Sequence, residues 1–471
     1  MFGLELCQYR RALTKTVKSL RNPRAIVGLG LVLAAGLAMI SVPVRAQSLL
    51  LGPAPRLIKS RPIYDPALPT GAERATQLAI TEANLRRQCS PTHPLCVTWA
   101  KTDTTSAVLD ALSTLERAYD RFVYGLALPA PALTDSGEPL TWRLTPKDEP
   151  LSVRLVPQLA APFDTAAVVC RSGTESELER RAHLCVGEAI AARLDPGETP
   201  AVRRGYALNL WWMLGQLTPS DDVELVRAQS NPQAAVFTRD NLRSAATSAL
   251  FFEYLAEKYG RNDAMAAVPT GMLALSAQKT SADSWRYQNA PDVTDVVRAT
   301  FDDNRAEWAT RILEFGFARM ETRPDHHGLL PLVWLGDVAA PRVDWVLKAS
   351  SLPRRVAPAL PLEPWGSVYI RLDLDVPTDK LQLGVKIEWE APVSMRWQIA
   401  KLDENNDETG RIDIAFEQLG TEIERRLVAL EGTSSLIIAG TNLGGVDLAH
   451  PFDPDHEPFE AHGCTVYIGK L

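Results

Sequence analysis

Histidines and carboxylates are the first candidates for chemistry in this sequence, because together they can hold zinc and activate a water molecule. The zinc motif His-Glu-x-x-His places two imidazoles four residues apart on one face of a helix. None of the seven histidines lies four residues from another. After His183 the sequence continues with Leu184 and, three residues later, Gly187, where a general base and a second imidazole would be needed. The sequence therefore predicts no zinc site, with His183 on a partly exposed helical face.

Other chemical motifs are weak. Ser276-Ala-Gln-Lys279 has the Ser-x-x-Lys spacing of penicillin-recognising enzymes, but the further elements of those enzymes do not follow at suitable distances. Two acidic loops, 403–407 and 450–462, lack the ligand spacing of a calcium or zinc site, so ordinary polar loops are favoured. The sequence has no glycine-rich phosphate loop and no Gly-x-Ser-x-Gly turn. These patterns favour a protein without catalytic residues, a metal or another cofactor.

The cysteines indicate an oxidising compartment. Cys89 and Cys96 bracket a short proline-containing loop, and Cys170 lies 15 residues before Cys185. We expect a disulfide in each pair, with Cys464 left as a free thiol of unassigned role. A cysteine-based zinc site is disfavoured, because the sequence contains no Cys-x-x-Cys pair.

The first 46 residues have the pattern of a secretory signal peptide. They contain seven basic residues and one acid, with an uncharged apolar stretch over 25–44 and a small residue, Ala46, before Gln47. We expect cleavage near Gln47; a retained anchor is the alternative, because the apolar stretch is long. Cleavage leaves 43 basic and 56 acidic residues, a formal net charge of −13. Such a chain binds nucleic acid and anionic membranes poorly, and we expect it to be secreted or periplasmic.

Hydrophobic periodicity predicts helices across the middle of the chain. Residues 105–122 carry apolar side chains at steps of three and four. Capping residues predict that two further helices begin near 174 and at Thr199-Pro200. Another helix is expected at 241–259, and shorter ones up to residue 320. Strand-like stretches between 139 and 170 predict a small sheet on which these helices pack.

The period changes from about 3.6 to 2 after the proline-rich linker 351–364. Alternating apolar residues predict strands at 368–374, 385–389, 395–399, 412–415, 436–439 and 465–468. Short strands at this spacing predict an antiparallel β-sandwich over 365–471. The expected class is α+β, and the expected segments are a signal peptide (1–46), an extended lead-in with a disulfide loop (47–104), an α+β domain (105–350), the linker, and the β-sandwich domain.

The order of these elements resembles that of secreted bacterial metalloproteases of the gluzincin kind. The similar stretches cover most of the mature chain and include Leu126-Ala-Leu-Pro129, Leu194-Asp-Pro-Gly197 and 249–260. The resemblance implies a thermolysin-like mixed sheet plus helical bundle for the peptidase-like domain 105–350. It also implies a third zinc ligand on the helix after residue 199. That helix reads Arg203-Arg204-Gly205-Tyr206 and offers no carboxylate there.

The resemblance and the missing motif together suggest an exported pseudoenzyme that acts in binding or scaffolding at the cell envelope or outside the cell. An active hydrolase with a non-standard site and a structural envelope protein are the alternatives. The two helices that flank a zincin cleft offer Glu188, Tyr206, Asn209 and Trp212 as candidates for lining a groove. The expected ligand is an unknown protein or peptide, not nucleic acid and, after signal cleavage, not a membrane.

Overall fold

The structure is a computed structural model that describes residues 85–100, 105–131, 140–144, 151–153, 168–170, 175–195, 198–214, 223–237, 244–259, 266–276, 293–301, 305–320, 340–391, 393–414, 421–445 and 461–471. The expected signal peptide and most of the lead-in lie outside these residues. The described part combines helices with three β-sheets, which confirms the α+β class. Within it, no helix is both long enough and apolar enough to cross a membrane.

The N-terminal sheet has five strands in sequence order: β1 (Leu85–Cys89), β2 (Leu95–Ala100), β3 (Leu140–Leu144), β4 (Leu151–Val153) and β5 (Val168–Cys170). Strands β2 and β3 run parallel and the other neighbours antiparallel, so the sheet is mixed. The expected Cys89–Cys96 disulfide is confirmed and joins the facing ends of β1 and β2. Cys185 is also disulfide-bonded; its pairing with Cys170 stays a prediction, because the side chain of Cys170 is not among those described.

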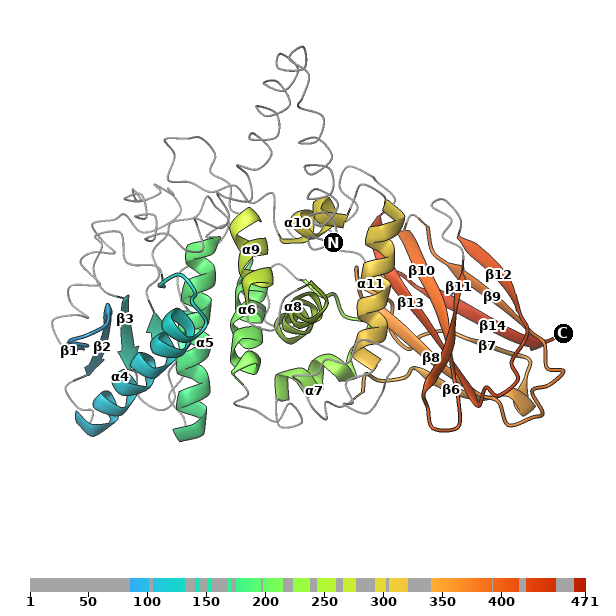
Figure 1. Ribbon diagram of the computed structural model, residues 1–471, viewed down its shortest axis with the longest axis horizontal. Coiled ribbons are helices and arrows are strands. Elements are labelled where there is room, and N and C mark those ends of the chain that lie inside the picture. Colours follow the sequence, from blue (N-terminus) through green and yellow to red (C-terminus); the bar gives the residue numbers. More distant parts are fainter. Residues whose placement is uncertain are drawn as a thin grey trace, which may run out of the picture.

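Helix α4 (Thr105–Tyr119) packs on β2 and α5 and continues into a π-helical turn, η2 (Asp120–Gly125). The helices that follow are α5 (Glu175–Leu194), α6 (Pro200–Met213), α7 (Val223–Ser230), α8 (Ala245–Tyr259), α9 (Ala267–Ser276), α10 (Val293–Phe301) and α11 (Arg305–Met320). Helix α8 lies at the centre of this bundle, with α6, α7, α9 and α11 around it (Figure 1). Every described residue of α8 from Ala245 to Ala256 is buried.

Two glycines allow the helices of the bundle to approach closely. A Cβ on Gly187 of α5 would lie 2.8 Å from the Cβ of Ala207 on α6. A Cβ on Gly205 of α6 would lie 2.6 Å from the Cβ of Ser248 on α8. Real Cβ atoms do not approach this closely, so both positions need glycine and fix the spacing of α5, α6 and α8.

The C-terminal strands form two further sheets. One has the order β11 (Glu408–Ile414), β10 (Val393–Leu402), β13 (Ser435–Gly445), β8 (Ser367–Asp373) and β6 (Trp345–Lys348). The other has the order β12 (Glu422–Leu427), β9 (Leu383–Trp389), β14 (Cys464–Lys470) and β7 (Arg354–Val356). Inward side chains from both sheets share one apolar cluster, and along β9 buried and partly exposed residues alternate strictly, as the sequence period predicts.

Strands β6 and β7 precede residue 365, so the two sheets take in residues on the N-terminal side of the expected boundary. The expected hairpin tip at 403–407 joins β10 and β11, and the Asp403 carboxylate accepts the backbone N–H groups of Asn405 and Asp407. Cys464 is a free and buried thiol.

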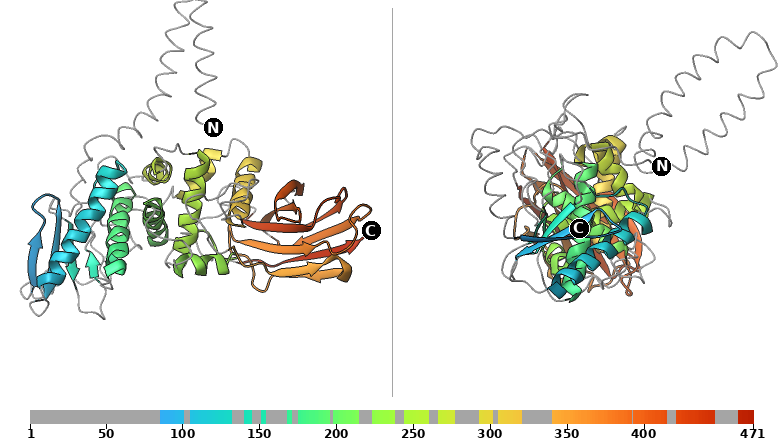
Figure 2. Two further views of the ribbon diagram at one scale, coloured as in Figure 1. Left: turned by 60° about the horizontal axis from the view of Figure 1, so that its bottom comes forward. Right: turned by 90° about the vertical axis from the view of Figure 1, so that its left-hand side faces the viewer.

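Helix α11 packs on the outer face of the five-stranded C-terminal sheet, the one that contains β10 and β13. It lies between that sheet and the other helices (Figures 1 and 2). Its Leu313 and Phe317 are buried against Tyr369 of β8, whose hydroxyl donates to the carbonyl of Gly316 at 2.6 Å. Arg319 is fully buried at the same junction and donates to the carbonyl of Ala228 in the last turn of α7, at 3.0 Å. The helices and the sheets therefore share a packed, hydrogen-bonded interface.

Candidate functional site

The zinc position that the resemblance implies falls where α5 and α6 pack together. Helix α6 starts at Pro200, and the Thr199 hydroxyl caps it by accepting the N–H of Val202 at 3.3 Å. This start brings Arg204 of α6 opposite α5, which carries His183. The surroundings of these two side chains decide what the site can hold.

His183 is fully buried, and both of its ring nitrogens have partners. Nδ1 lies 2.7 Å from the backbone oxygen of Glu179, and Nε2 lies 3.3 Å from Nη1 of Arg121. Because an arginine can only donate, Nε2 must accept and the proton must sit on Nδ1. Burial lowers the pKa of His183 to about 4, so the ring is neutral at physiological pH. The expectation of a partly exposed histidine is wrong, because α4, η2 and α6 cover this part of α5.

A second metal ligand one turn from His183 would have to replace Gly187. That position faces α6 at the close contact with Ala207, where even a methyl group would lie 2.8 Å from its neighbour. Leu184, in the place of a catalytic base, is fully buried. In a zinc peptidase with the His-Glu-x-x-His motif, this face of the helix points toward the metal. Here the same face of α5 packs against α6.

Arg204 lies in the stretch of α6, residues 203–206, where the resemblance implies a third zinc ligand, and it carries a positive charge instead of a carboxylate. Its Nη1 lies 2.8 Å from Oε1 of Glu188 on α5, and its Nη2 lies 3.5 Å from Glu224 on α7. Glu224 also lies 3.5 Å from Arg180. Burial opposes the charge of Arg204, but the two carboxylates outweigh that effect and hold its pKa above the ordinary value. A permanent cation thus sits between the acids that could otherwise attract a metal ion.

The four predicted groove residues lie in two different environments. Glu188 is partly exposed and paired with Arg204. Tyr206, Asn209 and Trp212 are buried; the Tyr206 hydroxyl lies 2.8 Å from that of Thr270 on α9. A groove lined by all four stays a prediction.

A buried acid–amide pair between α6 and α8 was not expected from the sequence. Asn209 Nδ2 donates to Oε2 of Glu253 at 2.5 Å, both side chains are fully buried, and burial raises the pKa of Glu253 to about 7. Among the described residues, Oε1 of Glu253 and Oδ1 of Asn209 have no hydrogen-bond partner. A proton on Glu253 would let these two oxygens pair with each other. A glutamate within the apolar run Phe-Phe-Glu-Tyr-Leu was the available signal.

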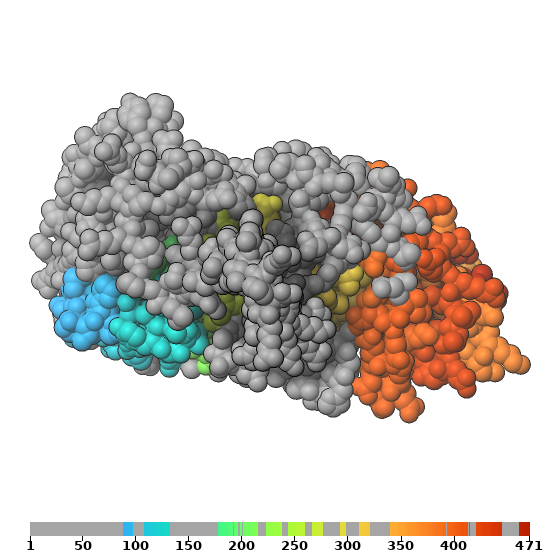
Figure 3. Space-filling model, turned by 45° about the horizontal axis from the view of Figure 1, so that its top comes forward, coloured from blue at the N-terminus to red at the C-terminus, as the bar shows by residue number. Residues whose placement is uncertain are grey.

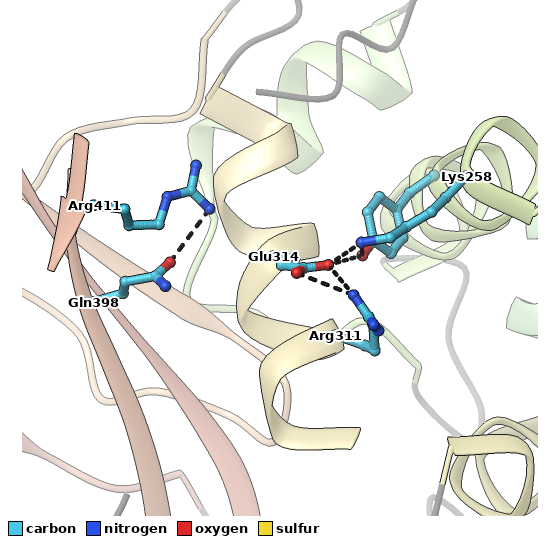
Figure 4. Close-up of polar contacts among 6 residues, drawn as sticks. Lys258, Arg311, Glu314, Gln398 and Arg411 are labelled. Atoms are coloured by element: carbon cyan, nitrogen blue, oxygen red, sulfur yellow. Dashed lines mark hydrogen bonds and ion pairs between the residues drawn. The ribbon is translucent and has the colours of Figure 1, made fainter. Parts of the chain in front are cut away.

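A second polar cluster, also not expected from the sequence, lies where α8 meets α11. Figure 4 shows Glu314 of α11 pointing away from the β-sheet toward Lys258 of α8 and Arg311, while Arg411 lies on the opposite side of α11. The Tyr254 hydroxyl donates to Glu314 at 3.0 Å. Burial alone would raise the pKa of Glu314, but the two cations outweigh it and hold the pKa below its ordinary value. Over the described part of the chain, no three His, Cys, Asp or Glu side chains group in a way that could hold a metal ion.

No known protein family and no curated protein sequence matches this chain. Among solved structures, it is similar to the pre-peptidase C-terminal domain of a Bacillus anthracis collagenase (10% identity, TM-score 0.18, 28% of this chain and 99% of that one). It is also similar to the CBM22-1 xylan-binding domain from Paenibacillus barcinonensis (16% identity, TM-score 0.17, 25% and 71%). A third is a periplasmic inhibitor of g-type lysozyme from Aeromonas hydrophila (7% identity, TM-score 0.17, 28% and 100%). Likenesses this weak indicate neither the fold nor the function of this chain.

Proposed function

We propose that this chain is an exported pseudoenzyme: a gluzincin-like helical domain without a zinc site, followed by a β-sandwich, acting by binding a protein or peptide. The observation that carries the proposal is Arg204, which places a guanidinium between two carboxylates in the stretch of α6 where the resemblance implies a zinc ligand. The contact between Gly187 and Ala207 supports it, because no imidazole fits there.

The environment of His183 supports the same conclusion by a different route. Zinc binds the unprotonated lone pair of an imidazole nitrogen. In His183 that lone pair belongs to Nε2, which faces the guanidinium of Arg121 at 3.3 Å. A dication would have to displace this fixed positive charge and would gain a single ligand in return.

The cellular location and the two-domain organisation are part of the proposal. The Cys89–Cys96 disulfide supports an oxidising compartment, the periplasm or the medium. The shared core of the two C-terminal sheets supports a β-sandwich, as expected for 365–471.

The test of the zinc-free site is metal titration and proteolysis by the purified exported protein. Zinc is titrated by calorimetry, and casein hydrolysis is followed with and without chelator, beside a zincin with an intact motif. We expect no stoichiometric zinc and no chelator-sensitive hydrolysis, both for the natural chain and for His183→Ala. Stoichiometric zinc that disappears in His183→Ala would refute the proposal.

The binding role needs its own measurement. Fluorescently labelled casein peptides are mixed with the intact chain, and anisotropy reports binding. Saturable binding supports a peptide ligand. Its absence at protein concentrations up to about 1 mM, where the binding free energy would be only about −4 kcal/mol, would contradict that ligand class without restoring a zinc site.

A further inference from the structure

A different group of polar side chains lies at the end of the molecule remote from the C-terminal sheets. It forms where the turn of the β1–β2 hairpin meets η2, the π-helical turn after α4 (Figures 1 and 2). Figure 3 shows the described atoms of the hairpin, in blue, beside those of α4 and η2, in cyan, at the surface. The hairpin contributes Ser90, Thr92 and His93, and η2 contributes Asp120 and Tyr124.

These side chains form a continuous chain of hydrogen bonds from hydroxyl to imidazole to carboxylate. The Thr92 hydroxyl oxygen lies 2.7 Å from Nδ1 of His93, and Nε2 of the same ring lies 2.8 Å from Oδ1 of Asp120. Because the carboxylate can only accept, Nε2 carries a proton, and in the neutral ring Nδ1 is then the acceptor. In that form the Thr92 hydroxyl donates to the Nδ1 lone pair, which is the arrangement that activates a nucleophilic hydroxyl; the Ser90 hydroxyl oxygen lies further away, 3.5 Å from Nδ1 and 3.3 Å from the Thr92 hydroxyl oxygen.

The chain of hydrogen bonds is held in place by its surroundings. The Cys89–Cys96 disulfide closes the hairpin turn. The Ser90 hydroxyl oxygen accepts the backbone N–H groups of Thr92 and His93 at 3.2 and 3.0 Å, which fixes the turn. The His93 ring packs edge-on against Tyr119 with its centroid 5.0 Å away, and its side chain is only 11% exposed. Thr92, in contrast, is exposed, so its hydroxyl is accessible to a substrate.

We propose that Thr92 is a nucleophile activated by His93, that Asp120 positions the imidazole, and that the site accepts acyl groups from aryl esters. The aryl preference follows from Tyr124, which is 67% exposed and lies with its ring centroid 6.3 Å from that of His93. This activity is separate from the proposed binding function and from α5 and α6. The π-helical turn that supplies both Asp120 and Tyr124 is a rare element that recurs at functional sites.

The reaction has two steps. First, the Thr92 oxygen bonds to the ester carbonyl carbon while its proton moves to Nδ1 of His93. The bond to the aryloxide breaks, and the aryloxide departs with the electron pair and takes that proton. Second, water adds to the acyl carbon and passes a proton to Nδ1, the bond to Thr92 breaks, and the Thr92 oxygen recovers the proton. The products are a phenol and a carboxylic acid, and no oxidant, metal or cofactor is consumed.

The test uses the purified full chain with p-nitrophenyl acetate. We expect a burst of nitrophenolate and an acetyl group on the peptide that contains Thr92, seen by mass spectrometry. Thr92→Ala and His93→Gln should lower the burst rate at least tenfold, because general-base assistance is worth about 10²-fold or more. Thr92→Ser keeps a hydroxyl and should retain the label. Thr409→Ala and His462→Ala, which change an exposed threonine and another histidine, should leave the rate unchanged.

The role of Asp120 is tested by rescue. Asp120→Asn should lower the burst rate, and Asp120→Glu, which restores a carboxylate, should recover part of it; a purely structural tie would not distinguish the two in this way. Thermal unfolding of each variant shows whether the hairpin is intact. Acetyl groups found on lysines or on other histidines, unchanged labelling in Thr92→Ala, or no label on the natural chain would each overturn the proposal.

Discussion

Glu253 should make the stability of the protein fall as the pH rises from acid to neutral. Its carboxyl is fully buried, and burial moves its pKa from 4.5 to about 7. The native state therefore keeps a proton that the unfolded chain releases above pH 4.5. The stabilisation from that proton is complete below pH 4.5 and is lost as the pH rises to about 7. At 1.36 kcal/mol per pKa unit, the loss amounts to about 3 kcal/mol.

The variant that isolates this effect is Glu253→Gln. A glutamine can accept from Asn209 Nδ2 and donate to Asn209 Oδ1, so it reproduces the neutral acid–amide pair without titrating. We expect the variant to match the natural chain near pH 4 and to be about 3 kcal/mol more stable at pH 8. Urea unfolding at several pH values gives the free energies of unfolding directly.

Glu314→Gln is the matched control, because the sign of its effect is opposite. Lys258 and Arg311 hold the pKa of Glu314 low, so its ionised form stabilises the fold above the pKa of the unfolded chain, and that stabilisation is lost in acid. The glutamine variant should be less stable than the natural chain at pH 7 and closer to it in acid. If the free energy of unfolding of Glu253→Gln still falls by about 3 kcal/mol between pH 4.5 and 7, Glu253 is not the group responsible.

Further predictions concern packing and charge. Arg204→Ala should lower the free energy of unfolding in urea by about 3 kcal/mol, since it removes the hydrogen-bonded cation from the partly buried Glu188 and one of the two cations beside Glu224; a loss below about 0.5 kcal/mol would contradict the pairing. Gly187→Ala should cost about 1–3 kcal/mol through overpacking. Gly271→Ala, on a helix with open space at that position, should instead stabilise by about 0.5 kcal/mol, and equal effects of the two would exclude the close contact as the cause. Replacing Cys89 and Cys96 by serine should lower the melting temperature, because the seven-residue separation implies about 2 kcal/mol.

Local pattern predicts much of this fold. The helix expected from near 174 to 193 is α5, and the alternating stretches at 368–374, 385–389 and 436–439 correspond to β8, β9 and β13. Strand β9 gives the clearest signal, because buried and partly exposed residues alternate along it. Strand β12 was missed because charged residues dominate it: only Ile423 and Leu427 are buried.

The polar sites could not be predicted, because their partners are distant in sequence. Arg121 and His183 are 62 residues apart, and Asn209 and Glu253 are 44 apart. The spacing rules used for motifs apply within one helix or loop and do not indicate which helices will face each other. Thr92-His93 was overlooked for the same reason, since its carboxylate, Asp120, comes from another element.

Buried Arg319 has a consequence for how the molecule moves. Its guanidinium donates to the carbonyl oxygen of Ala228 and to the side-chain amide oxygen of Gln229, at the end of α7. Its helix, α11, packs on the five-stranded C-terminal sheet. A hinge between the bundle and the sheets would have to strip a permanent cation of these acceptors in a dry interface, at a cost of several kcal/mol. The two halves are therefore expected to behave as one cooperative unit, melting in a single calorimetric transition, and any ligand meets surfaces whose relative orientation is set in advance.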